Sequence, residues 1–174
     1  MKCKMFLAGS GGQGTLAIGQ MLAKAAMEEG KEVTWLPSYG PEMRGGTANC
    51  TVVISDRPIS CPHINEADVL VVMNLPSLLK FESMVSPGGL LIINSSLVPE
   101  KAQRTDIRVL EVPANEKAAE LGNDKAANMV MLGAILHETH IVRPKTIHSQ
   151  LEKMFSGRKA AFLPLNTRAL EMYL

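Results

Sequence analysis

The stretch KMFLAGSGGQGTLAIGQ, residues 4–20, determines the fold class of this chain. Its apolar beginning at 4–8 is typical of a short buried strand, and the run at 15–29, rich in Ala, Leu and Met, is typical of a helix. The turn GSGGQG at 9–14 joins them and satisfies the spacing G-x-G-x-x-G. A strand, a glycine turn and a helix in this order predict an α/β fold.

Apolar runs and turn signals continue this pattern along the chain. The predicted strands are 32–37, 47–55, 67–74, 90–94 and 106–112, with SPGG at 86–89 read as a turn. The predicted helices are 76–84, 114–121, 125–138, 144–155 and 159–173. We therefore expect one α/β domain over residues 1–174: a three-layer, Rossmann-like, mostly parallel sheet with helices on both faces and a helical C-terminus.

Bulk composition excludes several classes of function. The 174 residues carry a net charge of +1 and only 4% aromatic side chains, which disfavours electrostatic or stacking contacts with nucleic acid. No apolar run approaches the length of a membrane span, and the N-terminus does not resemble a signal peptide. The three cysteines form no CxxC pair, and HETH at 137–140 lacks the zinc spacing HExxH. We expect a cytoplasmic protein with reduced thiols and no metal site.

The glycine turn allows two interpretations. Glycines here permit an anionic group to approach the amides of a helix N-terminus, and Gln13 adds a side-chain donor and acceptor. A dinucleotide site also expects an Asp or Glu about 20 residues further on. The second predicted strand ends at 35–38 without an acid, which weakens NAD, FAD and S-adenosylmethionine interpretations. Close packing of strand and helix is the other explanation for the glycines.

A second glycine-rich loop, SYGPEMRGG at 38–46, follows the second predicted strand. If that strand is parallel to the first, both loops and Asn94 meet at the carboxyl edge of the sheet, where ligands bind in such folds. Arg44 offers a fork of donors for phosphate or carboxylate. The candidate ligand-binding residues are Gly9, Ser10, Gly11, Gly12, Gln13, Gly14, Ser38, Tyr39, Gly40, Arg44, Gly45, Gly46, Asn94 and Ser95.

Several motifs occur together in a recognisable order. GSGGQG, SYGPEMRGGTANC, ISDRPI, ADVLVVMN, PGGLLIIN and NMVMLGA span roughly residues 4–137. In order and spacing they resemble the gamma subunits of 2-oxoacid:ferredoxin oxidoreductases, of the 2-oxoglutarate and branched-chain 2-ketoacid type. The same module is similar to one domain of pyruvate:ferredoxin oxidoreductase. SYGPEMRGG is the most specific part of the resemblance.

The resemblance implies a subunit that works only in a complex. A 2-oxoacid and coenzyme A give acyl-CoA, CO2 and two electrons, which pass to ferredoxin. Thiamine diphosphate, Mg and iron–sulfur clusters are expected on partner subunits, and coenzyme A is expected as a substrate near this chain. The turn from Gly9 to Gly14 and the side chain of Arg44 would accommodate the coenzyme A phosphates. Tyr39, Pro41 and Met43 would pack against catalytic subunits. An isolated chain could form a homodimer.

Three other functions remain open from the sequence. The chain could be the small subunit of indolepyruvate oxidoreductase, which is a related family. It could be a free-standing nucleotide-binding protein, such as a dehydrogenase or a methyltransferase, although the missing acid argues against both. It could also be an assembly module that binds no ligand.

Overall fold

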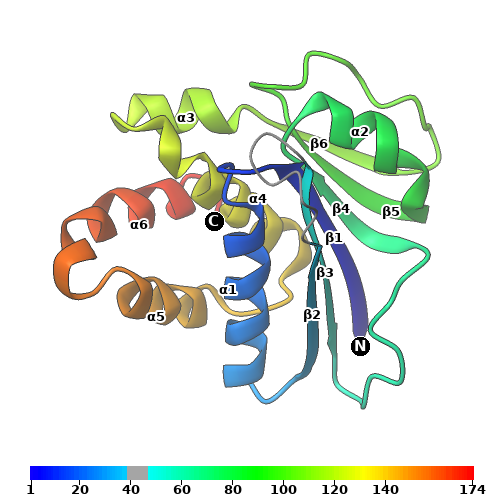
Figure 1. Cartoon of the computed structure of the whole chain (residues 1–174), viewed down its shortest axis with the longest axis horizontal. Helices are drawn as coiled ribbons and strands as arrows, with labels where there is room; N and C mark the ends of the chain where they lie inside the picture. The colour runs from blue at the N-terminus through cyan, green and yellow to red at the C-terminus, as the bar shows by residue number, and fades with distance from the viewer. Residues whose placement is uncertain (39–46) are drawn as a thin grey trace.

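The computed structural model describes residues 1–38 and 47–174. Its strands form one sheet in the order β2-β3-β1-β4-β5-β6 (Figure 1). Their bounds are β1 Lys2–Ser10, β2 Glu32–Ser38, β3 Thr47–Ser55, β4 Ala67–Val72, β5 Val85–Asn94 and β6 Arg108–Val112. The sheet therefore places the first strand near its centre.

Strand direction decides which loops meet. β1, β4, β5 and β6 are parallel neighbours, whereas β3 is antiparallel to both β1 and β2. Because β3 is antiparallel to both of its neighbours, β2 runs in the same direction as β1, although these two strands do not touch. The predicted mostly parallel sheet is confirmed, and the carboxyl ends of β1, β2, β4, β5 and β6 lie at one edge.

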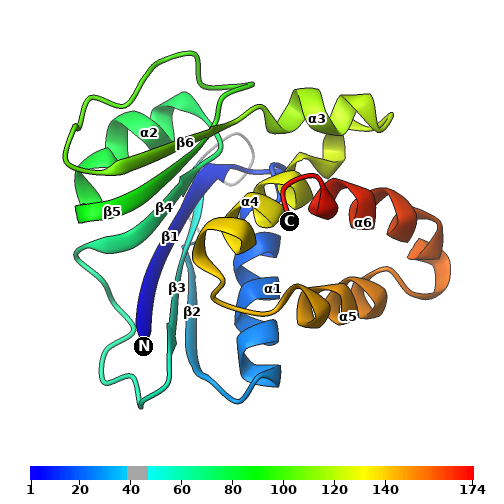
Figure 2. The same cartoon turned by 180° about the vertical axis from the view of Figure 1, so that it is seen from behind.

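Helices cover both faces of the sheet, as predicted. The α-helices are α1 Thr15–Glu28, α2 Leu75–Phe81, α3 Ala114–Glu120, α4 Ala127–Thr139, α5 Pro144–Met154 and α6 Leu163–Glu171. Short 3-10 turns are η1 Glu82–Met84, η2 Asp124–Ala126 and η3 Gly157–Phe162. α2 packs on one face, and α1 and α4 pack on the other with α5 and α6 outside them (Figures 1 and 2).

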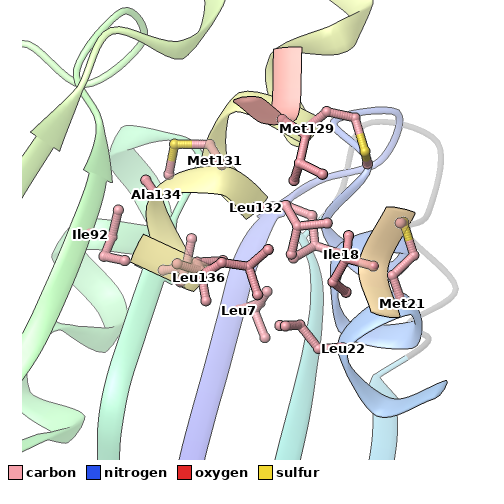
Figure 3. Close-up of a cluster of buried hydrophobic side chains, with 14 of the residues drawn as sticks. Leu7, Ile18, Met21, Leu22, Ile92, Met129, Met131, Leu132, Ala134 and Leu136 are labelled. Carbon is pink, nitrogen blue, oxygen red and sulfur yellow. The ribbon is translucent and has the colours of Figure 1, made fainter. Parts of the chain in front are cut away.

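The larger core lies between the sheet, α1 and α4. Figure 3 shows Leu7 of β1 near Ile18 and Leu22 of α1, and Ile92 of β5 near Ala134 and Leu136 of α4. Every residue of α4 from 129 to 136 is buried, so this helix is apolar on all sides and is enclosed by the sheet and its neighbouring helices. Across the described residues, no helix has both the length and the apolar character needed to cross a bilayer.

Several predicted boundaries were wrong, including that of the last helix, which was expected over 159–173 but is divided into η3 Gly157–Phe162 and α6 Leu163–Glu171. Residues 86–89 were read as a turn, but they belong to β5, whose register with β4 shifts at this point. Gly88 has φ 74° and donates its amide to the Asp106 carbonyl at 2.8 Å, so the strand begins with an irregular segment rather than a separate turn. The predicted turn at 9–14 also begins too early, because Gly9 and Ser10 pair with Ala48 and Thr47.

Candidate ligand site at the carboxyl edge of the sheet

The glycine turn places an uncapped helix N-terminus at the carboxyl edge. Gly12 and Gly14 have φ 87° and 76°, a region that glycine adopts without steric cost. Gly14 is the N-cap of α1, and no described side chain caps this helix. The first amides of α1 therefore carry the positive end of the helix dipole with no side-chain acceptor.

The glycines of the turn have different structural roles. A Cβ on Gly9 would lie 2.6 Å from Thr15 Oγ1 and 2.9 Å from Met73 Cβ, so this glycine is required for packing. A Cβ on Gly14 would collide with the Asn128 side chain of α4. A Cβ on Gly12 would meet nothing within 4 Å. Gly12 is thus the one of these three that faces open space.

Gln13 is held inside the turn rather than free at its mouth. Its Oε1 accepts a hydrogen bond from the Ser10 amide at 2.7 Å, and its Nε2 donates to the Met73 carbonyl at 3.2 Å. The side chain therefore links the end of β1 to the residue after β4. An anion that used the Ser10 amide would have to displace the Gln13 carboxamide.

One buried hydroxyl beside the turn has no hydrogen-bond partner. Thr15 is 1% exposed, and its Oγ1 finds no donor or acceptor among the described residues. A buried polar group without a partner carries a desolvation cost, so such groups are concentrated where a ligand, ion or water completes the structure. This hydroxyl lies next to Gly9 at the start of α1.

A groove of about 150 Å³ opens at the same edge. It is lined by Gly12, Gln13, Met73, Leu97, Asn115, Asp124, Lys125, Ala127 and Asn128. Lys125 supplies a cation, while Asn115 and Asn128 supply amide donors and acceptors. These three side chains were not among the candidate residues. The polar residues Asn123, Asp124 and Lys125, where the predicted helix 125–138 begins, were the available signal for Lys125.

The second glycine-rich loop begins and ends at the same edge of the sheet. Ser38 pairs with Asn49, and Thr47 pairs with Ser10. Thr47 therefore lies next to the end of β1, and Ser38 lies on β2, one strand further out. The candidate residues Tyr39, Gly40, Arg44, Gly45 and Gly46, with Pro41 and Met43, lie outside the described residues.

Asn94 is held by α3, and Ser95 is held by the end of β6. The Asn94 side chain is fully buried, donates to Asn115 Oδ1 at 2.8 Å and accepts from the Ala114 amide at 3.3 Å. The Ser95 amide donates to the Val112 carbonyl at 2.9 Å. Asn94 thus has a structural role: it orients Asn115, which lines the groove.

The thiols and imidazoles do not gather at this edge. Burial raises the pKa of Cys50 to about 12, against a smaller lowering influence of the neighbouring Trp35. Burial, followed by the charge of Asp68, also raises the pKa of Cys3 to about 12. The part of the chain that the structure describes holds no group of three His, Cys, Asp or Glu side chains arranged to bind a metal.

The fold and this edge define a doubly wound α/β domain with a polar groove at the strand ends. The chain matches the family described as "Pyruvate ferredoxin/flavodoxin oxidoreductase" over residues 4–172. It therefore belongs to the pyruvate ferredoxin/flavodoxin oxidoreductase family, and the resemblance found in the sequence is confirmed.

Individual relatives agree with this assignment. The chain is 34% identical over 154 residues to 2-oxoglutarate synthase subunit KorC of Methanocaldococcus jannaschii, covering 87% of this chain and 82% of KorC. It is 44% identical over 166 residues to ketoisovalerate oxidoreductase subunit VorA of Methanothermobacter thermautotrophicus, covering 95% of this chain. The chain spans only 34% of the length of that VorA.

A solved structure gives the same result. The keto/oxoacid ferredoxin oxidoreductase gamma subunit from Geobacter sulfurreducens superimposes with a TM-score of 0.82 and 29% identity. The superposition covers 98% of this chain and 95% of that one. The helical C-terminus is therefore part of the shared fold.

Proposed function

We propose that this chain is the gamma-type subunit of a multi-subunit 2-oxoacid:ferredoxin oxidoreductase. The enzyme would convert a 2-oxoacid, coenzyme A and two oxidised ferredoxins to acyl-CoA, CO2, two reduced ferredoxins and a proton. The observation that carries this proposal is the match over nearly the whole length of both this chain and KorC, a named subunit of 2-oxoglutarate synthase. The chain would act in the cytoplasm and only within the complex.

The proposed contribution of this chain is to accommodate coenzyme A and to help assemble the complex. The uncapped α1 N-terminus, the open position at Gly12 and the cation of Lys125 suit the phosphates of an anionic ligand. The unpartnered Thr15 hydroxyl provides a further polar group beside the turn. Within the second loop, we propose Arg44 as a phosphate contact and Tyr39 as a contact to catalytic subunits.

The redox and decarboxylation chemistry is proposed to reside on partner subunits. Thiamine diphosphate with Mg would supply the carbanion-stabilising chemistry, and iron–sulfur clusters would carry electrons to ferredoxin. The groove beside Gly12 offers one lysine and two asparagines, whose donors suit an anionic substrate, and one aspartate, whose negative charge opposes it. Residues of this chain would bind and orient coenzyme A without taking part in electron transfer.

The alternative functions have less support. The relatives described above are named for 2-oxoglutarate, ketoisovalerate and keto/oxoacid enzymes, which does not favour an indolepyruvate enzyme or a free-standing nucleotide-binding protein. β2 ends without an acid that could hold a ribose hydroxyl, which also disfavours a dinucleotide site.

The test is gentle affinity purification from the native host, followed by mass spectrometry and an activity assay. The assay follows coenzyme A-dependent reduction of a viologen dye with a panel of 2-oxoacids. Co-purification of larger cluster-containing subunits, with reduction driven by one 2-oxoacid, is the expected result. A chain that purifies alone and binds a nucleotide tightly would refute the proposal. An Arg44→Ala complex with unchanged apparent affinity for coenzyme A would refute the ligand role of Arg44.

A further inference from the structure

A second groove, of about 310 Å³, opens beside the first and is mostly apolar. Its apolar lining comes from η2, α4, α5 with its C-cap, η3 and α6: Ala126, Met129, Met154, Phe155, Phe162 and Leu165. Lys125 and Asn128 line both grooves, so the two are neighbours. Phe162 is 51% exposed, whereas Met129 is 1% exposed and forms part of the floor.

The hairpin that bounds this groove projects away from the sheet. Figure 1 shows α5, η3 and α6 as two helices joined by a turn, with η3 far from the strands. Every residue of η3 from Gly157 to Phe162 is exposed. This segment places Arg158 and Lys159 next to Phe162, so basic and aromatic side chains share one accessible tip.

The lining of this groove carries two positive charges and no negative charge, and the carboxylate of Asp124 lines the neighbouring groove. Lys125 and Lys159 line it, together with three asparagines, and none of the lining residues is a carboxylate. Within the described part of the chain, no ion pair includes Lys125, Arg158 or Lys159. Lys153 of the same hairpin, in contrast, pairs with Glu28 at 3.1 Å. The groove therefore selects for an occupant that brings negative charge.

We propose that this groove receives an acidic segment of another subunit of the complex. The segment inserts an aliphatic or aromatic side chain against Phe155, Phe162 and Leu165 and sets carboxylates near Lys125 and Lys159. Methionine side chains suit such an insertion because they adapt to the shape of a partner, and phenylalanine side chains offer a large apolar surface. This inference rests on the proposed function, since it requires that the chain works in a complex.

The charge of the groove argues against a second copy of this chain as the occupant. A symmetric dimer through this face would bring the same surface of each copy together, including Lys125 and Lys159. Like charges brought close together across an interface are unfavourable. An acidic partner segment removes this repulsion.

The experiment uses the complex reconstituted by co-expressing this chain with the subunits that co-purify with it. A zero-length carbodiimide reagent joins lysines to carboxylates in direct contact, and mass spectrometry identifies the joined peptides. We expect Lys125 or Lys159 to be joined to an Asp or Glu of another subunit. Links to a second copy of this chain, or no link from either lysine, would overturn the inference.

Variants of exposed residues provide the second measurement. We expect Phe162→Asp and Lys159→Glu to weaken retention of the chain in the complex by about tenfold or more. The matched controls are Leu79→Asp on α2, on the other face of the sheet, where Leu79 is 63% exposed, and Lys24→Glu on α1. Equal retention of the groove variants and the controls would overturn the inference.

Two further controls distinguish a loss of binding from a loss of folding. Circular dichroism and urea unfolding of each isolated variant establish that the chain is folded, and Lys159→Gln provides a milder variant of an exposed side chain. If the wild-type chain itself does not assemble with these subunits, the proposed function fails and this inference fails with it. If the wild-type chain assembles and the groove variants assemble equally well, the inference fails while the proposed function stands.

Discussion

The Glu29 carboxylate and the Thr146 hydroxyl are 2.7 Å apart, although 117 residues separate them in sequence. Glu29 is the C-cap of α1, and Thr146 lies in the first turn of α5. The same Glu29 oxygen accepts a hydrogen bond from the Arg143 amide at 2.7 Å. One carboxylate therefore satisfies donors at the N-terminus of α5, where the helix dipole favours a negative charge.

We expect Glu29→Ala to lower the free energy of unfolding by about 2 kcal/mol, because it leaves donors to a charged group without their acceptor. The Glu29 side chain is 7% exposed, so water cannot replace the carboxylate freely. Urea unfolding monitored by circular dichroism measures the change. Glu32→Ala, an exposed glutamate on β2, is the control. Equal effects of the two substitutions would contradict a structural role for Glu29.

The contribution of Glu29 should depend on pH. Burial by itself raises the pKa of Glu29. The hydrogen bonds from the Arg143 amide and the Thr146 hydroxyl, together with the nearby charges of Arg143 and Lys31, have a larger and opposite effect. The pKa of Glu29 is therefore lowered below its usual value. A lowered carboxyl pKa stabilises the folded state above the unfolded-state pKa of about 4.3. We therefore expect the stability difference between wild type and Glu29→Gln to be full at pH 7 and to shrink as the pH falls through the folded-state pKa. Urea midpoints from pH 7 to pH 3 measure this difference, and a gap that widens on acidification would show the sign to be wrong.

Gly19 packs α1 against a thiol of the sheet. A Cβ on Gly19 would lie 2.5 Å from Cys50 Sγ and 3.1 Å from Trp35 Nε1. We expect Gly19→Ala to destabilise the protein by about 1–3 kcal/mol through overpacking. In a Cys50→Ala background the sulfur is absent, and the intrinsic helix preference of Ala should make the same change neutral or favourable. A double-mutant cycle measured by guanidinium unfolding gives the coupling energy between the two substitutions. An equal loss of stability in both backgrounds would show that the clash does not involve Cys50.

Gln13 should control the rigidity of the glycine turn. Gln13→Met keeps the length of the side chain but removes the bonds to the Ser10 amide and the Met73 carbonyl. We expect a stability loss of about 1 kcal/mol and faster hydrogen exchange at the Ser10 amide. Gln20→Met on α1 is the control for loss of a glutamine. Unchanged exchange at Ser10 would show that the turn does not depend on the Gln13 carboxamide.

The three cysteines should differ in the rate at which their thiols react. Cys61 is exposed, whereas the pKa values of Cys3 and Cys50 are raised to about 12 by burial. The thiolate is the reactive form, so we expect Cys61 to react quickly with a disulfide reagent at pH 8 and the other two to react slowly in the folded chain. Cys61→Ser should remove the fast phase. A fast phase that persists in this variant would show that Cys3 or Cys50 is accessible.

Much of the architecture was predictable because local patterns carry it. β4 and β5 are buried on both faces, so their residues must be apolar, and the runs ADVLVV and LLIIN showed this directly. The glycine turn was found because a strand, a turn and a helix adjoin in sequence. The family resemblance was found because the glycine turn, the loop SYGPEMRGG and the later motifs occur in a characteristic order and spacing.

Tertiary structure decided which side chains meet. The sequence placed Gln13 at the mouth of the helix, but its partner is the Met73 carbonyl, 60 residues away, and this bond directs the side chain inward. Lys125, Asn128 and Asn115 join the groove because α3 and α4 return to the carboxyl edge after β6. Local periodicity reports burial within one element, whereas these contacts depend on how separate elements pack, and the sequence by itself does not specify that geometry.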